Sequence, residues 1–417
     1  MSGPSAEEVR TEVRAWLAEA WDPDLALAEW RSRLVDAGWG CPTWPREWYG
    51  RGLPAELGRV ATEELRAAGS VGPAIGVGMS LAAPTLLAHA SDELKGRLLR
   101  RIVTGEDTWC QLFSEPGNGS DLAGLTTHAR RDGDEFVVEG QKVWTTGAHH
   151  AAYGMLLART DWDVPKHKGI TFFAFPMRQP GVEVRPLRQM NGRASFNEVF
   201  LSEARVPADH VVGELHGGWT VAMTTLAHER GLGAGLFGSL PSDGSGRTRT
   251  EAIAEATAYL KTYEWYPQRA GRADLVPARA AAHGRTGDAV VRQRVAHLLA
   301  TERTARWTAD RAGAARRAGR PPGAEGSIGK LAGSLIAREA AAAHGTIAGA
   351  HGMLTGPDSP EGGIVAEVLV SVPGASIAGG TDEVQHNIIG ERVLGLPKEP
   401  SVDADIPFRQ VKVNRRS

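Results

Sequence analysis

The stretch Gln111-Leu-Phe-Ser-Glu-Pro-Gly-Asn-Gly-Ser-Asp121 lies where the sequence changes from a helical to an extended texture. Its proline and two glycines force a turn, and Ser120 and Asp121 can bond the backbone amides of that turn. Such a turn presents N–H groups to an anion such as a pyrophosphate. A plain connection between two strands explains the same composition. The stretch therefore marks a boundary in the fold and a candidate anion site.

The residues before this boundary are expected to form helices. In Ala6–Ala20 the apolar side chains recur at i, i+4, i+7 and i+8, which is an amphipathic stripe. Three further segments behave similarly: Leu25–Ala37, Pro54–Ala68 and Leu86–Val103. Clusters of proline and glycine, such as Cys41–Gly50, separate them.

The residues after Asp107 are expected to form short strands, because β-branched and aromatic runs are separated by turn residues such as Gln179-Pro-Gly181. The expected strands are Phe136–Glu139, Met155–Arg159, Ile170–Pro176, Val182–Val184 and Glu198–Leu201. Strands at this spacing indicate a small antiparallel sandwich or barrel.

Helical texture returns from Gly217 onward. The main segments are Trp219–Leu240, Glu251–Tyr263, Ala289–Ala315 and Ser327–His344, with Asp382–Leu394 as a candidate final helix. Pro241–Thr250 is rich in Ser, Gly and Arg and is expected to be a flexible loop. Helices, a compact β unit and helices again make an α+β layout without alternating βαβ units. A chain of 417 residues also exceeds the roughly 250–300 residues of one core.

Composition excludes several classes of protein. The formal net charge of −2 gives no expectation of binding nucleic acid or an anionic membrane. The apolar runs are shorter than the roughly 18–20 residues of a membrane span, and the polar N-terminus lacks the core of a signal peptide. Cys41 and Cys110 are the only cysteines, so we expect no disulfide framework and a cytoplasmic location.

Two motifs could mislead. Gly233-Ala-Gly-Leu-Phe-Gly238 matches the dinucleotide pattern G-x-G-x-x-G, but it lacks a preceding strand and falls in a helical segment. Close helix packing explains its small residues better. His149-His150 is an adjacent pair, and adjacent residues of a strand point to opposite faces, so no metal site is expected.

A second informative stretch is Gly140-Gln-Lys-Val-Trp-Thr-Thr-Gly147, which follows an expected strand. Trp144 offers a flat apolar face, and Thr146 shares its side of the strand. Stacking with one hydroxyl suits a flat heterocycle with polar ring atoms. A tryptophan in a sandwich core is an equally good explanation of this stretch alone.

Together these stretches resemble the acyl-CoA dehydrogenase family. The run Ser114–Asp121, the run Gly140–Thr146 and Ala378-Gly-Gly-Thr-Asp-Glu-Val-Gln385 occur in the family's order and separation. Gly217-Gly-Trp219 and Asn387–Pro397 also fit, so the resemblance covers about residues 5–397.

The resemblance implies three domains: a helical domain at 1–106, a middle β domain at 107–214 and a C-terminal four-helix bundle at 215–397, followed by a tail at 398–417. It also implies FAD, an acyl-CoA substrate, an electron-transfer flavoprotein as acceptor, and a dimer or tetramer. Carried over position by position, the flavin would be surrounded by Phe113, Ser114, Gly119, Ser120, Trp144 and Thr146. Thr381 and Glu383 would lie near its adenosine half.

The sequence departs from the family in three places. Many members have a glutamate base immediately before the Gly-Thr of the C-terminal motif, where this chain has Gly379. The backbone N–H of Gly379 is retained, and in the family this amide polarises the thioester carbonyl. The family's Arg-x-x-Phe-Gly matches only Ala280-Ala-Ala-His-Gly284, and its Gln-rich Gly-Gly segment matches only Thr346–Gly352. These segments bind the FAD of a neighbouring subunit in the family.

The chemistry nevertheless needs a base, because an α C–H beside a thioester is a weak acid. Members that resemble the isovaleryl and long-chain branches carry the glutamate on the first helix of the C-terminal domain, and here that position is Glu229. Ala222, Leu226 and Glu229 fall on one stripe, so the carboxylate would be desolvated. Arg230 is a supporting residue or part of a structural ion pair. A helix-edge glutamate neutralised by nearby cations is the alternative.

The leading hypothesis is FAD-dependent α,β-dehydrogenation of an acyl-CoA with Glu229 as base. A flavin monooxygenase or oxidase on the same fold is a second interpretation. A third is a subunit of a hetero-oligomer, in which a paralogous partner completes the FAD site.

Overall fold

The computed structural model describes residues 3–231, 245–318 and 323–411. The chain forms two compact units, and three separate segments, residues 1–187, 195–262 and 402–417, make up the first. The second unit comprises residues 188–194 and 263–401. The sequence of helices, strands and helices confirms the expected α+β fold. The domain boundaries expected from the sequence stay a prediction.

The N-terminal region is helical, as its apolar stripes predict. Its helices are α1 (Ala6–Ala20), α2 (Leu27–Asp36), α3 (Ala55–Ala67), α4 (Ala83–His89) and α5 (Asp92–Thr104). A capping box starts α1, in which Ser5 Oγ accepts from the Glu8 amide and Glu8 Oε2 accepts from the Ser5 amide. The single helix expected over residues 86–103 is wrong. The chain turns at Ala90, and the Ser91 side chain caps a new helix.

Eight strands form one hydrogen-bonded sheet in the order β6-β7-β3-β2-β4-β5-β8, with β1 beside β4. They are β1 (Trp109–Leu112), β2 (His128–Asp132), β3 (Glu135–Thr146), β4 (Tyr153–Arg159), β5 (Ile170–Pro176), β6 (Val182–Leu187), β7 (Phe196–Pro207) and β8 (Val211–Val212). Most pairs are antiparallel, whereas β1 and β2 each pair with β4 in parallel.

The sheet curls around its own core. One buried cluster draws side chains from β1, β2, β3, β4, β5 and β7. Phe136 on β3 meets Phe173 on β5 with ring centroids 5.2 Å apart, although two strands separate β3 from β5 in the sheet order. A curled sheet of this kind agrees with the expected sandwich or barrel.

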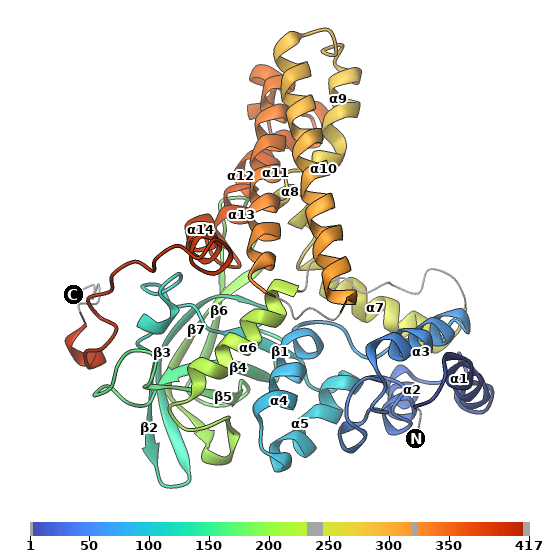
Figure 1. Ribbon diagram of the computed structural model, residues 1–417, viewed down its shortest axis with the longest axis vertical. Coiled ribbons are helices and arrows are strands. Elements are labelled where there is room, and N and C mark those ends of the chain that lie inside the picture. The colour runs from blue at the N-terminus through green and yellow to red at the C-terminus, as the bar shows by residue number, and fades with distance from the viewer. Residues whose placement is uncertain (1–2, 232–244, 319–322, 412–417) are drawn as a thin grey trace. The chain divides into compact units, whose positions relative to one another are not determined.

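A second core lies between the sheet and the helices α4, α5 and α6 (Gly218–Gly231). Phe172 on β5 and Val221 and Ala222 on α6 are at most 2% exposed in this layer. Figure 1 shows α6 across the face formed by β4 and β5. The first unit also contains α7 (Arg247–Lys261), which begins inside the loop expected at Pro241–Thr250.

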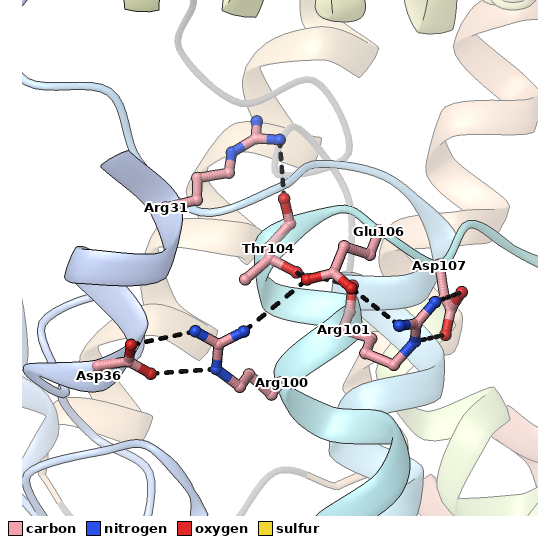
Figure 2. Close-up of polar contacts among 7 residues, drawn as sticks. All are labelled: Arg31, Asp36, Arg100, Arg101, Thr104, Glu106 and Asp107. Atoms are coloured by element: carbon pink, nitrogen blue, oxygen red, sulfur yellow. Dashed lines mark hydrogen bonds and ion pairs between the residues drawn. The ribbon is translucent and has the colours of Figure 1, made fainter. Parts of the chain in front are cut away.

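A polar network fixes the junction between α5 and β1 (Figure 2). Arg100 bonds Asp36 on α2 through two 3.0 Å contacts. Arg101 bonds Glu106 at 2.8 Å and both carboxylate oxygens of Asp107 at 2.6 and 2.9 Å. Asp107 is 7% exposed and stands two residues before β1, so this network sets where the strand begins.

The second unit is helical. Its helices are α8 (Tyr266–Arg269), α9 (Val276–Ala282), α10 (Ala289–Arg317), α11 (Glu325–Ala348), α12 (Ile364–Ser371), α13 (Pro373–Ile377) and α14 (Asp382–Ile388). The two long helices α10 and α11 lie side by side (Figure 1). Among the described residues, the run Pro360–Val393 is long and apolar enough to cross a membrane by length and composition alone. Gly379 and Gly380 have φ of +70° and +87° and break this run between α13 and α14, so it is weak evidence for a membrane segment.

Residues 402–411 return to the first unit. The Phe408 side chain is 2% exposed, and the Arg159 guanidinium carbon lies 3.4 Å from the centroid of its ring. Arg159 also donates to the carbonyls of Ala123, Leu125 and Lys166. The sequence contains no pattern that predicts this packing.

Candidate functional site

A buried ion pair joins the two stretches that the sequence singled out. Lys142 Nζ lies 2.9 Å from Glu115 Oε1 and donates to the Phe113 carbonyl at 3.1 Å. The Val143 amide donates to the Ser114 carbonyl at 2.9 Å. The structure therefore brings Phe113 and Ser114 against the strand that carries Trp144 and Thr146.

The loop after Ser114 is an open turn. Glu115 and Asn118 exchange two backbone hydrogen bonds of 3.1 Å, which closes the turn around Gly117. A Cβ added at Gly117 or Gly119 would meet no described atom within 4 Å, and Ser120 is exposed. Its outer face is therefore accessible to a ligand.

Trp144 stands at an irregularity near the end of β3. The register with β7 shifts between Lys142 and Thr145, and Trp144 has a φ of +62°. A bulky residue rarely adopts this backbone, so the surrounding structure must hold it there. Its indole is 56% exposed and meets the Phe196 ring edge-on at 5.7 Å. The interpretation of Trp144 as a core residue is wrong, and its exposed face suits a stacking partner.

Glu229 lies in the last described turn of α6. The stripe expected on this helix is present, since Ala222 is fully buried and Trp219 and Leu226 pack against the same core. Glu229 is half-buried, and its Oε2 accepts from Gln111 Nε2 at 3.3 Å. The carboxylate is thus held against β1, two residues before Phe113. The Arg230 side chain and the segment Gly233–Gly238 lie outside the described residues.

Gly379, Thr381 and Glu383 lie in the second unit. The Thr381 hydroxyl accepts from the Val384 amide at 3.2 Å and caps α14. Gln385 Nε2 donates to the carbonyls of Gly379 and Gly380, which fixes the left-handed turn before the helix. Glu383 is exposed beside this cap.

Arg279 stands directly before Ala280–Gly284, the segment that departs from the family's arginine motif, and it bonds other side chains of the second unit. Arg279 bonds the carboxylate of Glu361 and lies 2.6 Å from His344 Nδ1. Glu361 also accepts from His283 Nε2 at 2.8 Å, and His344 Nε2 lies 3.0 Å from the Arg272 carbonyl. Burial lowers the pKa of His344, which keeps its imidazole neutral as an acceptor for Arg279.

His149 and His150 lie in a turn after β3 and not on a strand, and their ring centroids are 3.9 Å apart. The expectation that they point to opposite faces is therefore wrong. No group of three or more His, Cys, Asp or Glu side chains suited to a metal ion occurs among the described residues.

The residues of the first unit fit a flavin. They combine an exposed indole face, the half-buried Thr146 at the end of β3 and an open glycine turn. An exposed aromatic face with a hydroxyl nearby suits a flat heterocycle. An accessible turn with backbone N–H groups suits the phosphates attached to it.

Three family models match the chain: the acyl-CoA dehydrogenase N-terminal domain at 4–106, its middle domain at 110–204 and its C-terminal domain at 274–394. The acyl-CoA dehydrogenase IpdE1 of Mycobacterium tuberculosis is 34% identical over 417 residues, which cover 94% of this chain and 98% of that protein. The acyl-CoA dehydrogenase FadE34 of the same species is 36% identical over 94% of this chain, but the match spans 49% of that protein's length.

Solved structures agree with these matches. The Tcur3481-Tcur3483 steroid ACAD has a TM-score of 0.66 and 28% identity, with 96% of this chain and 99% of that chain covered. The ChsE4-ChsE5 complex from Mycobacterium tuberculosis has a TM-score of 0.60 and 28% identity, with the same coverage. The chain therefore belongs to the acyl-CoA dehydrogenase family, whose members are FAD-dependent flavoprotein oxidoreductases.

Proposed function

We propose that this enzyme removes the α proton and the β hydride of an acyl-CoA, with Glu229 as the base. The observation that carries the proposal is the Glu229 carboxylate on α6, which Gln111 holds beside the strand that leads to Phe113. The position at which many relatives carry the base is Gly379, which has no ionisable group. Glu229, at the alternative position used by some family members, therefore serves as the base in place of a residue at position 379.

The FAD-binding residues would be those of the open turn and the end of β3: Phe113, Ser114, Gly119, Ser120, Trp144 and Thr146. FAD, when bound, supplies the acceptor for the β hydride. Trp144 offers its exposed face for stacking, and the turn offers backbone N–H groups to the phosphates. Thr381 and Glu383 would serve the adenosine half, next to the N-terminal cap of α14.

Glu229 would receive the α proton. Removal of this proton requires that the thioester carbonyl is polarised, and the backbone N–H of Gly379 is the expected donor. The Glu229 side chain is half-buried, which limits access of water to the carboxylate. A carboxylate shielded from water is a stronger base than one in bulk solvent.

The substrate class that we propose is the CoA thioester of a bulky lipid or steroid acid. Support comes from the steroid ACAD, which is 28% identical over 96% of this chain. An electron-transfer flavoprotein is the proposed acceptor of the electrons, and the cytoplasm the proposed compartment. Rapid oxidation of the reduced enzyme by oxygen, with a hydroxylated product, would favour the monooxygenase or oxidase interpretation.

A hetero-oligomer is the proposed assembly. Alanine stands at position 280, where the family has the arginine that reaches the FAD of a neighbouring subunit, and Arg279 is engaged by Glu361 and His344. A paralogous partner would supply the missing contacts. Two similar structures, Tcur3481-Tcur3483 and the ChsE4-ChsE5 complex, are each named for two proteins.

The decisive experiment is anaerobic flavin reduction by a panel of acyl-CoAs. Glu229→Gln should fold and bind FAD but reduce it at least about 1,000-fold more slowly, because the base is lost. Glu198→Gln is the matched control, since Glu198 also accepts from a glutamine amide, at 3.0 Å from Gln141 Nε2. Near-normal reduction by Glu229→Gln would refute the assignment. A colourless protein when the chain is purified alone, and a yellow one with its paralogue, would support the hetero-oligomer.

A further inference from the structure

Gln111 is a polar residue on a strand whose other side chains are buried and apolar. Side chains on β1 alternate, so Cys110 and Leu112 enter the core inside the curled sheet. Trp109 and Phe113 enter the layer between the sheet and the helices, and both are 5% exposed. Gln111 shares their side of the strand and is half-buried. A glutamine in this layer needs a hydrogen-bonding partner, because an unpaired amide there is costly.

The partner of Gln111 is Glu229, at 3.3 Å between Nε2 and Oε2. The donor is a side-chain amide, whose N–H points in a fixed direction, so the bond orients one oxygen of the carboxylate. Glu229 is therefore held in a defined orientation by a side chain from another element.

β1 also connects this contact to the flavin loop. Phe113 follows Gln111 by two residues on the same side, a rise of roughly 7 Å along an extended strand. The start of β1 is anchored through Asp107 and Arg101 (Figure 2). A carboxylate bonded to Gln111 is thus fixed relative to the loop that is expected to hold the flavin.

We propose that Gln111 is the positioning residue for Glu229: its amide sets the orientation of the carboxylate. The proposal rests on the proposed function, because it presupposes that Glu229 is the base. A second glutamine–glutamate pair among the described residues of the first unit, Gln141 with Glu198, has the same chemistry and a 3.0 Å distance. Its removal is a control, because it deletes a hydrogen bond between an amide and a carboxylate without changing the contact to Glu229.

The test measures anaerobic flavin reduction as a function of pH in the flavin-loaded enzyme, with its partner subunit if FAD binding requires one. In Gln111→Leu we expect a limiting rate about 10- to 100-fold lower, with the half-saturating acyl-CoA concentration changed by less than about two-fold. The pKa on the acidic limb of the profile should rise, because the anion has lost a donor. Gln141→Leu should keep the wild-type rate and profile.

Gln111→Glu should recover part of the flavin-reduction rate at low pH. This recovery is not expected if Gln111 only fills space. At low pH the pair of carboxyl groups at 111 and 229 holds one proton, and the protonated group donates to the other. At high pH both groups are charged and repel each other. The rate of Gln111→Glu relative to wild type should therefore rise as the pH falls.

Two results would overturn the proposal. One is a wild-type rate and pH profile in Gln111→Leu. The other is a loss that is equal at every pH, with a weaker half-saturation and no low-pH rescue in Gln111→Glu, since this identifies Gln111 as a packing residue. Failure of the proposed function is distinguishable, because then Glu229→Gln itself reduces the flavin normally.

Discussion

Lys142 and Glu115 form an ion pair inside the protein, with Nζ 2.9 Å from Oε1 and Lys142 fully buried. The amides of Thr126 and Thr127 donate to the same carboxylate at 2.7 and 2.9 Å. Burial raises the pKa of Glu115, but the Lys142 charge and these hydrogen bonds outweigh burial and hold it at about 2. The pair therefore locks the first turn of the candidate flavin loop to β3.

Removal of one partner of this pair should destabilise the protein more than removal of both. Glu115→Gln or Lys142→Met leaves a buried charge without its counterion, which costs about 3–5 kcal/mol. The double variant leaves no such charge and should recover part of the loss. Urea unfolding of the FAD-free protein measures the free energies. A double variant that is less stable than either single variant would contradict this expectation.

The same pair predicts a loss of stability in acid. The folded-state pKa of Glu115, about 2, lies below its ordinary value of 4.5, so the unfolded chain binds the proton first as the pH falls. The stabilisation from this group is fully present above pH 4.5 and is lost between about pH 4.5 and 2. Melting temperatures of wild type and of Glu115→Gln/Lys142→Met should converge in that window. Parallel curves would show that this carboxylate does not contribute.

Trp144→Ala should weaken FAD binding with little effect on the FAD-free fold. The ring is 56% exposed, so its removal costs little packing, whereas loss of a stacking partner lowers affinity about 10-fold. Flavin fluorescence titration and thermal unfolding of the FAD-free protein separate the two effects. Trp307→Ala removes a ring that is 64% exposed in the second unit and serves as the control. Unchanged FAD affinity in Trp144→Ala would remove this residue from the site.

Phe408→Ala should release residues 402–411 from the first unit. Truncation of a buried phenylalanine costs about 3–5 kcal/mol, and here it also removes the ring that packs on the buried Arg159. Limited proteolysis should then cut this segment faster, and the unfolding midpoint should fall. Val402→Ala is the control, because that side chain is 94% exposed. Equal protection of the segment in both variants would contradict the packing described here.

Regular patterns were predictable from the sequence. The amphipathic stripe of α1 gave its bounds, Ala6–Ala20, and the apolar run of β5 gave Ile170–Pro176. These elements are set by their own side chains, so a local pattern is sufficient. The site motifs were visible for the same reason, since glycine, proline and tryptophan mark an unusual backbone.

Features that depend on distant partners were not predictable. β1 is four residues long and is a strand because β4 lies beside it. Lys142 resembles a solvated residue in the sequence, and its buried position follows from Glu115, 27 residues away. The role of Gln111 depends in the same way on a distant partner, because its amide bonds Glu229 on α6. A glutamine between tryptophan and phenylalanine in an apolar strand was the one available sign of a buried polar contact.

The return of residues 402–411 to the first unit has a consequence for synthesis of the protein. The segment that covers Arg159 with Phe408 emerges from the ribosome after the whole second unit. The β unit, whose last strand ends at Val212, must therefore wait, with one face uncovered, while roughly 200 further residues are translated. At about 5–20 residues per second this lasts about 10–40 s, during which chaperones have access to that face.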